Sequence, residues 1–208
     1  MIAIIDYGMG NVQSVANAFA RLGFKTVLTG DLKTIKNCTT LVLPGVGAFG
    51  RAIKELREKG LLEHLREREQ EGTYILGICL GLQLFFDSSQ EDPGWGGLSF
   101  FSGQVVRFPT SVKVPHMGWN RVYHNNDNPL FEGIPCGCHF YFAHSFYGFP
   151  GGEELFLARC RYGVEFPAAL RKKNVYGLQF HPEKSGEWGL RVLQNFGRMI
   201  IDAGNTSY

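Results

Sequence analysis

Apolar residues follow two rhythms in the first half of this chain. Short continuous apolar runs predict strands buried on both faces of a parallel sheet, at 2–5, 26–28, 41–43 and 74–76. Between these runs, apolar residues recur every three or four positions, which predicts helices over 12–22, 49–56, 61–65 and 80–85. Asn11 stands at the N-cap position of the first helix, and Gly23 follows that helix as a stop signal.

The pattern changes from about Leu98 onward to strand-rich segments. These segments lie at 104–108, 139–142, 154–158, 168–171 and 175–180. They predict antiparallel additions to the sheet edge. The run Arg171-Lys172-Lys173 is expected to form a polar turn between two of them. A closing helix is predicted from apolar positions at Leu190, Leu193, Phe196 and Ile200.

Strands that alternate with helices predict an α/β fold with right-handed crossovers. We expect a flavodoxin-like open sheet, mixed but mostly parallel, with helices on both faces. The chain has 208 residues and contains no repeat, low-complexity tract or linker. A length of this order suits one domain with a well-buried core, so we predict a single domain over 1–208.

Composition excludes several classes of partner. The formal net charge is +2, and the basic residues are dispersed, which argues against a nucleic-acid or membrane-surface protein. No apolar stretch approaches the roughly 20 residues of a membrane span, and no signal peptide is visible. The five cysteines are odd in number and irregularly spaced, so we expect no disulfide scaffold and a reducing cytoplasm.

Two segments suggest a metal or cofactor, and both are weak candidates. The run Cys136-Gly137-Cys138-His139 has no second ligand pair at zinc spacing. The glycines of Asp6-Tyr7-Gly8-Met9-Gly10-Asn11 resemble a dinucleotide fingerprint, but Gln13 stands in place of the third glycine. We therefore expect neither a metal nor a cofactor.

The strongest chemical signal is Gly77-Ile78-Cys79-Leu80-Gly81, which follows an apolar run. It has the Gly-x-nucleophile-x-Gly form of a nucleophile elbow, in which small residues allow a sharp turn from strand into helix. A helix that begins at Leu80 would direct its positive end at the sulfur and favour the thiolate. A lone cysteine is more often a buried structural thiol, but the flanking glycines favour a nucleophile.

His181 and Glu183 follow the predicted strand 175–180 and complete a candidate triad. Residues i and i+2 of an extended segment face the same way, so both side chains can address one site. Pro182 pushes His181 toward the extended region. The alternatives are a capped or surface histidine and a solvated carboxylate at the end of a strand.

Two further segments have both a functional and a plain structural interpretation. Leu43-Pro44-Gly45-Val46-Gly47 ends a predicted strand and is either a glycine turn or a source of backbone amides for an oxyanion. Pro115-His116-Met117-Gly118-Trp119-Asn120 has the aromatic and Met content of a contact surface, although Trp119 is equally suited to a core.

The motifs around Cys79 and His181 resemble those of the class I (triad) glutamine amidotransferases. The resemblance rests on Gly77 to Gln83 and on Gln179 to Lys184, and it extends over nearly the whole chain. It implies hydrolysis of glutamine through a thioester on Cys79, with His181 and Glu183 completing the triad. It also implies an oxyanion hole from Val46, Gly47 and Leu80, and glutamine contacts from Gln83, Glu91, Ser145 and Phe146.

Three more segments narrow the resemblance to a glutaminase subunit that serves a separate cyclase of (β/α)8 barrel form. They are Asp6 to Asn11, Pro115 to Asn120, and Tyr141 to Phe146. The resemblance implies a heterodimer whose interface includes Asn11, Trp119, Asn120, Tyr141 and Lys184. Phe146 departs from the Tyr that is frequent in the family, which is tolerable if the backbone does the binding.

Other classes of function remain open from the sequence alone. A cysteine peptidase or γ-glutamyl hydrolase would use the same triad without a partner. A non-catalytic binding subunit would tolerate loss of Cys79. A glutaminase that serves another synthase, such as a sugar-modifying one, is the nearest alternative, because the choice of acceptor lies in the partner.

Overall fold

The computed structural model describes residues 1–125 and 127–205, so residues 126 and 206–208 of the predicted 1–208 domain lie outside it. A nine-stranded mixed sheet forms its centre, with strand order β2-β1-β3-β4-β12-β11-β10-β7-β8. These strands are β1 Ile2–Ile5, β2 Thr26–Thr29, β3 Thr40–Gly45, β4 Tyr74–Cys79, β7 His116–His124, β8 His139–His144, β10 Phe156–Tyr162, β11 Val164–Lys172 and β12 Val175–Leu178. Pairing is parallel from β2 through β12 and antiparallel from β12 to β8, which confirms the predicted open mixed sheet.

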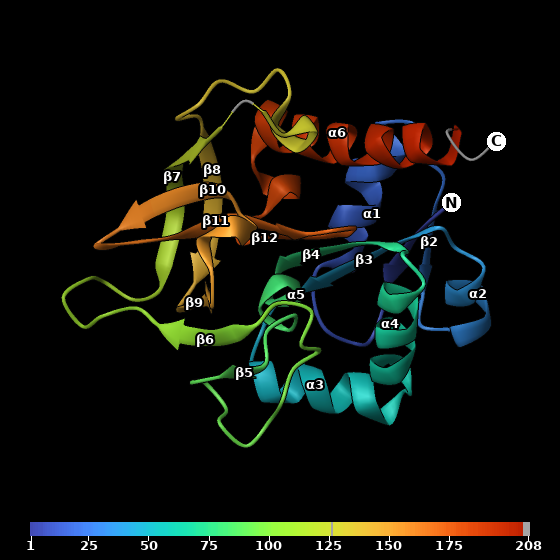
Figure 1. The fold of residues 1–208 in the computed structure, drawn as a ribbon, viewed down its shortest axis with the longest axis horizontal. Helices are drawn as coiled ribbons and strands as arrows, with labels where there is room; N and C mark the ends of the chain where they lie inside the picture. The colour runs from blue at the N-terminus through green and yellow to red at the C-terminus, as the bar shows by residue number, and fades with distance from the viewer. Residues whose placement is uncertain (126, 206–208) are drawn as a thin grey trace.

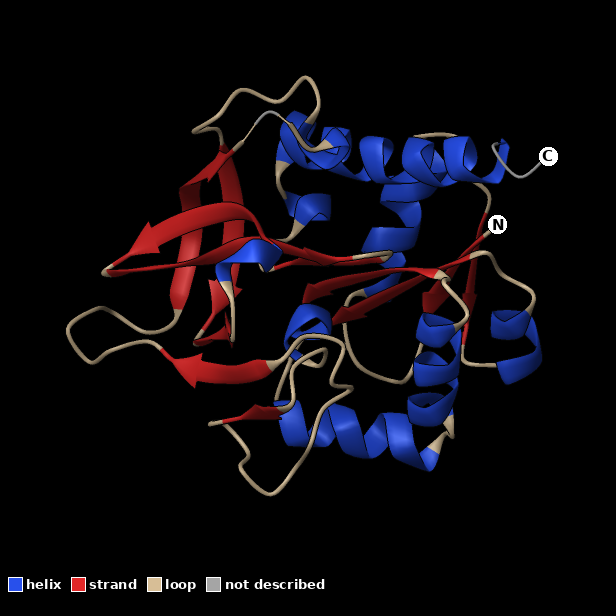
Figure 2. Ribbon diagram, viewed as in Figure 1, coloured by secondary structure: helices blue, strands red, loops and turns tan. Residues whose placement is uncertain are grey.

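Helices cover both faces of this sheet (Figures 1 and 2). They are α1 Val12–Arg21, α2 Leu32–Lys36, α3 Phe49–Glu58, α4 Leu61–Gln70, α5 Leu80–Gln83 and α6 Gly186–Asn205. In Figure 1, α1 and α6 lie on one face, and α2, α3 and α4 lie on the other. Three short 3-10 helices are η1 Pro129–Phe131, η2 Glu153–Leu155 and η3 Pro182–Lys184. None of the described helices is long and apolar enough to cross a membrane.

The core is divided by the sheet, because successive strand residues point to opposite faces. Ile2 and Ile4 of β1 belong to the cluster that packs against α1 and α6. Ala3 and Ile5 of the same strand belong to the cluster that packs against α3 and α4. A strand buried on both faces needs a continuous apolar run, which is why this part of the fold is legible in the sequence.

The antiparallel half differs more from the sequence-based expectations. A second, three-stranded sheet is formed by β5 Ser88–Ser89, β6 Gly103–Arg107 and β9 Phe146–Pro150. Neither β7 nor β9 was expected as a strand. Exposed aromatic and polar residues interrupt the apolar positions of β7, and Gly148 and Pro150 weaken the strand signal of β9. The predicted strand 154–158 begins instead as η2, and β10 starts at Phe156.

Candidate active site

Three adjacent parallel strands end at the candidate site. The last residue of β3, Gly45, lies opposite Cys79 at the end of β4. The next strand, β12, pairs with β4 and leads within three residues to His181. The carboxyl edge of the sheet therefore brings together the loop after β3, the turn after β4 and the segment after β12. This is the edge at which open α/β sheets bind their ligands.

Cys79 occupies a strained backbone conformation, with φ of 55°. A non-glycine residue in this region costs on the order of 1–3 kcal/mol, and such strain is concentrated at functional sites. The flanking glycines make the turn possible. A Cβ on Gly77 would lie 2.7 Å from the Gly81 backbone, and a Cβ on Gly81 would overlap the carbonyl of Leu43. The sharp elbow predicted from the sequence is therefore present. The helix that follows it, α5, has only four residues, so its dipole is small.

His181 and Glu183 form a buried ion-pair contact. The distance from His181 Nδ1 to Glu183 Oε1 is 2.9 Å, and the side chains are 4% and 2% exposed. The expectation of an extended 181–183 segment is wrong beyond His181, because Pro182 starts the 3-10 turn η3. Proline suits the first position of a helical turn, since its missing N–H would have no partner there. The turn still returns the carboxylate to the imidazole.

The environment favours the protonated form of His181. Burial alone lowers the pKa of this imidazole, but hydrogen bonding to Cys79 and to Glu183, and the charges of both, raise the pKa to about 10. An imidazolium beside a thiol suits a thiolate–imidazolium pair, and the thiolate is the nucleophilic form of cysteine.

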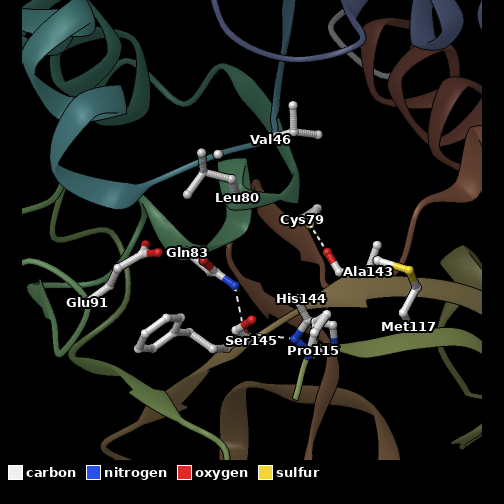
Figure 3. Close-up of a pocket in the computed structure, with 12 residues that line it drawn as sticks. Val46, Cys79, Leu80, Gln83, Glu91, Pro115, Met117, Ala143, His144 and Ser145 are labelled. Carbon is white, nitrogen blue, oxygen red and sulfur yellow. Dashed lines mark hydrogen bonds between the residues drawn. The ribbon is translucent and has the colours of Figure 1, made fainter. Parts of the chain in front are cut away.

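A cavity of about 180 Å³ opens beside Cys79 (Figure 3). This volume is below the roughly 300–1,000 Å³ of clefts that hold drug-sized ligands, so it suits a smaller molecule. The cavity is lined by Val46, Gly47, Cys79, Leu80, Gln83, Glu91, Pro115, Met117, Ala143, His144, Ser145 and Phe146. All seven residues that the sequence analysis assigned to the oxyanion hole and to glutamine contacts are in this set.

Backbone donors are available on the β3 and β4 side of the cavity. Leu80 is the first residue of α5, and the N–H of a first helical residue has no partner inside its helix. Gly47 has φ of 108°, a conformation that L side chains rarely adopt. A Cβ there would also lie 2.8 Å from the Met9 side chain. The loop after β3 thus needs glycine at this position.

The wall formed by Gln83 and Phe146 is internally hydrogen-bonded. Gln83 Nε2 donates to Phe146 O at 2.8 Å (Figure 3). It also donates to Gln179 Oε1 at 3.2 Å. Its amide hydrogens are therefore used, and only Oε1 of Gln83 can address a ligand. Sequence reasoning assigned no role to Gln179, although it lies in the His181 motif. Its Nε2 is 3.9 Å from Cys79 Sγ, and the carbonyl of Ala143 is equally far.

Glu91 contributes a carboxylate to the lining of the cavity. Its Oε2 accepts a hydrogen bond from the N–H of Phe49 at 2.9 Å, while the neighbouring Asp92 accepts from Gly50 at 2.8 Å. Burial raises the pKa of Glu91, the Phe49 N–H lowers it and Asp92 raises it. Both carboxylates cap the N-terminus of α3, a position that favours negative charge.

The residues assigned to a partner interface lie around the triad. Trp119 is 56% exposed, and its ring centroid is 6.1 Å from that of Tyr141. Tyr141 lies 6.4 Å from the His181 ring, and Lys184 Nζ is 5.9 Å from the Tyr141 centroid. Asn11 caps α1 and also lines a small cavity next to His181 and Glu183.

The side-chain amide of Asn120, like that of Asn11, is already bonded within the chain. It contacts His116 Nε2 at 3.2 Å and the carbonyl of Arg161 at 3.0 Å. Cys136 is exposed and Cys138 is half-buried, and all five cysteines are free thiols. Within residues 1–125 and 127–205, no cluster of three His, Cys, Asp or Glu side chains could hold a metal ion.

Comparison with known proteins gives a consistent result. The family model described as glutamine amidotransferase class-I matches residues 3–200. A protein of Moorella thermoacetica named imidazole glycerol phosphate synthase subunit HisH is 48% identical, over 100% of this chain and 99% of its own length. A subunit of the same name from Methanothermobacter thermautotrophicus is 49% identical over 96% of this chain and 99% of its own length.

Solved structures support the fold at greater distance. A crystal structure titled as a glutamine amidotransferase has a TM-score of 0.74 at 21% identity, covering 99% of both chains. A structure of PurLQS from Thermotoga maritima has a TM-score of 0.74 at 22% identity, covering 96% of this chain and 98% of that one.

Proposed function

The chain belongs to the class-I glutamine amidotransferase family, and from this premise we propose that it is the glutamine-hydrolysing subunit of imidazole glycerol phosphate synthase in histidine biosynthesis. The full-length similarity to proteins of that name supports the choice within the family. The observation that carries the chemistry is the strained elbow at Cys79, on the same sheet edge as the buried His181–Glu183 pair.

In this proposal the Cys79 thiolate attacks the side-chain amide of glutamine. The bond between sulfur and the amide carbon forms, and the carbonyl oxygen becomes an oxyanion held by N–H groups of Val46 or Gly47 and of Leu80. His181 gives its proton to the leaving nitrogen, so ammonia departs and a glutamyl thioester remains. Water then hydrolyses the thioester with His181 as base, and Glu183 keeps the imidazole in one orientation.

The cavity walls supply complementary groups for a free amino acid. The carboxylate of Glu91 suits the positive α-ammonium group. Ser145 and Phe146 would provide backbone N–H groups for the α-carboxylate. The carbonyl of Phe146 already accepts bonds from Gln83 and His144, so a backbone contact from Phe146 would come from its N–H. Phe in place of Tyr is compatible with this role, because the side chain is not the binding group.

Ammonia released in water at neutral pH would be mostly ammonium, a poor nucleophile. We therefore infer a heterodimer with a cyclase of (β/α)8 barrel form, which receives ammonia and makes imidazole glycerol phosphate and an aminoimidazole carboxamide ribotide. The Trp119, Tyr141 and Lys184 group next to His181 supports docking on this face. The five free thiols support a cytoplasmic location.

The proposal is tested by measuring whether the partner activates glutamine hydrolysis. Glutamine turnover is measured for the chain alone, with the cyclase, and with the cyclase plus its nucleotide ligand. We expect a nearly silent chain that the partner activates, because a glycine-flanked peptide at Val46–Gly47 can rotate its N–H toward the oxyanion. One oxyanion donor corresponds to roughly 10²–10³ in rate. Equal turnover in all three conditions would mean a stand-alone hydrolase.

A labelling experiment separates the proposed nucleophile from the other thiols. An electrophilic glutamine analogue should modify Cys79 and leave Cys38, Cys136, Cys138 and Cys160 unmodified, as located by mass spectrometry. A glutaminase that serves another synthase would label in the same way but would not support imidazole glycerol phosphate formation with the cyclase.

A further inference from the structure

Two buried histidines, His144 in the lining of the cavity and His116 bonded to it, take no part in the proposed chemistry. His144 ends β8, and His116 lies opposite it at the start of β7. They are 6% and 3% exposed. His144 Nδ1 is 2.7 Å from the carbonyl of Phe146, and His144 Nε2 is 3.1 Å from His116 Nδ1. His116 Nε2 is in turn 3.2 Å from Asn120 Nδ2.

The partners at the two ends of this series of hydrogen bonds determine which nitrogen of each ring carries the proton. A carbonyl oxygen only accepts, so His144 Nδ1 must carry a hydrogen. In a neutral ring Nε2 is then an acceptor, which requires His116 Nδ1 to donate. His116 Nε2 is left as an acceptor for the Asn120 amide. The amide orientation is consistent, because Asn120 Oδ1 accepts from the N–H of Arg121 at 2.8 Å.

Both rings sit in surroundings that oppose a charge. The ring of Tyr162 stacks on that of His116, with the ring centroids 4.1 Å apart. The ring of Phe142 also stacks on His116, with the centroids 4.8 Å apart. Burial lowers the pKa of His116 to about 4. The pKa of His144 falls to about 3, chiefly through burial, against the opposing effect of the Phe146 carbonyl. A protonated ring would present two donors and break the chain of bonds.

The carbonyl of Phe146 is the point at which this series of hydrogen bonds reaches the active site. It accepts from His144 on one side and from Gln83 Nε2 on the other. Gln83 also bonds Gln179, whose amide approaches Cys79. The peptide between Phe146 and Tyr147, which contains this oxygen, is thereby held by side chains from both directions, directly after the Phe146 N–H that is assigned to glutamine. At the far end of the hydrogen-bond network, Asn120 of β7 donates to the carbonyl of Arg161.

We propose that His116 and His144 are positioning residues that, as neutral Nδ1–H tautomers, fix the Ser145–Phe146 wall of the cavity for glutamine binding. The inference rests on the proposed function, since that wall is assigned to the substrate. It assigns the two histidines an indirect role, through the Phe146 carbonyl, rather than contact with the reacting atoms.

Nitrogen-15 NMR of the histidine-labelled full-length chain tests the tautomers without any activity. We expect both rings to be neutral and protonated at Nδ1 across neutral pH, opposite to the Nε2–H form that free histidine prefers. A ring protonated at Nε2, or one that titrates near the ordinary histidine pKa, would overturn the proposal. This readout stands even if the chain proves not to be a glutaminase.

Glutamine kinetics of the complex with the cyclase test the positioning role. His116→Phe keeps an aromatic ring but leaves His144 Nε2 without its donor, so the KM for glutamine should rise about tenfold with kcat little changed. His116→Asn restores a donor near Nδ1 and should recover most of the KM. His124→Phe is the control, because His124 is also buried on β7 and stacked on Phe131, but among the described residues its side chain bonds only Asn125.

Equal KM values for His116→Phe and His116→Asn would overturn the proposal, as would a KM rise of the same size in His124→Phe. If His116→Phe does not fold, the NMR result and the His116→Asn kinetics still decide it. A wild-type complex that does not hydrolyse glutamine would contradict the proposed function instead, and the tautomer measurement would remain valid.

Discussion

Glu183→Gln removes the charge of the buried pair and keeps the size of the side chain. Glu183 Oε1 is 2.9 Å from His181 Nδ1, and at 2–4% exposure water cannot replace the lost charge. The second carboxylate oxygen, Oε2, has no hydrogen-bond partner among the described residues, so the full charge is directed at the imidazole. A loss of about 10²–10⁴ in kcat is expected from the corresponding change in other triads, with KM for glutamine little changed.

The same variant should change the pH dependence of stability. The folded pKa of His181, about 10, lies above the ordinary value of 6.5, so the folded state binds more protons between these values. The stabilisation is complete below about pH 6.5 and is lost as the pH rises toward 10, at about 1.4 kcal/mol per unit of separation. Removing the charge of Glu183 lowers the folded pKa of His181 and so reduces the dependence of stability on pH.

The assay combines steady-state glutamine hydrolysis by the complex with denaturant unfolding of the chain at about pH 6.5 and about pH 9.5. The wild-type chain should be less stable at the higher pH, and the variant should show a smaller difference. A kcat within about tenfold of wild type, together with an unchanged difference in stability, would refute the role of Glu183.

Three further variants test the elbow, the loop after β3 and the docking face. Gly81→Ala should destabilise the chain by about 1–3 kcal/mol, because its Cβ would overlap the Leu43 carbonyl, whereas Gly94→Ala, in open space, should not; equal unfolding midpoints would contradict the packing. Gly47→Val should impair partner activation of glutamine turnover more than thermal stability, since a β-branched residue is strained at φ of 108°. Normal activation of this variant would show that rotation of the Val46–Gly47 peptide is not how the partner activates the enzyme. Lys184→Ala should lower the ratio of cyclase product to glutamate, because Lys184 covers Tyr141 beside His181, while exposed Lys54→Ala should not; an unchanged ratio in Lys184→Ala would exclude the coupling role.

The parallel half of the fold could be predicted because its central strands, β1, β3 and β4, are almost entirely buried on both faces. A run such as Ile2 to Ile5 is apolar at every position, and the turn at Cys79 is marked by glycines that only close packing explains. The antiparallel half gives weaker signals. On β7, Met117, Trp119 and Tyr123 are exposed and alternate with polar or buried residues. Large apolar residues at every second position normally mark the buried face of a strand, and here they mark the exposed face.

The site shows the same division. The residue types around Cys79 and His181 indicate their chemistry directly, and the family resemblance identified the residues that line the cavity. The tertiary partners have no such mark, because Gln179, His116 and His144 look like ordinary strand residues until the strands are paired. The geometry of Glu183 also lay beyond the sequence, since Pro182 reads equally well as an extended residue and as the start of a turn.

The most direct test of the central claim is the activity of the Cys79→Ala complex with two nitrogen sources. If Cys79 is the nucleophile, the variant should lose glutamine-dependent formation of imidazole glycerol phosphate and keep wild-type rates when ammonium salt replaces glutamine, because the cyclase needs only ammonia. Retention of glutamine-dependent synthesis within about tenfold of wild type would contradict the account.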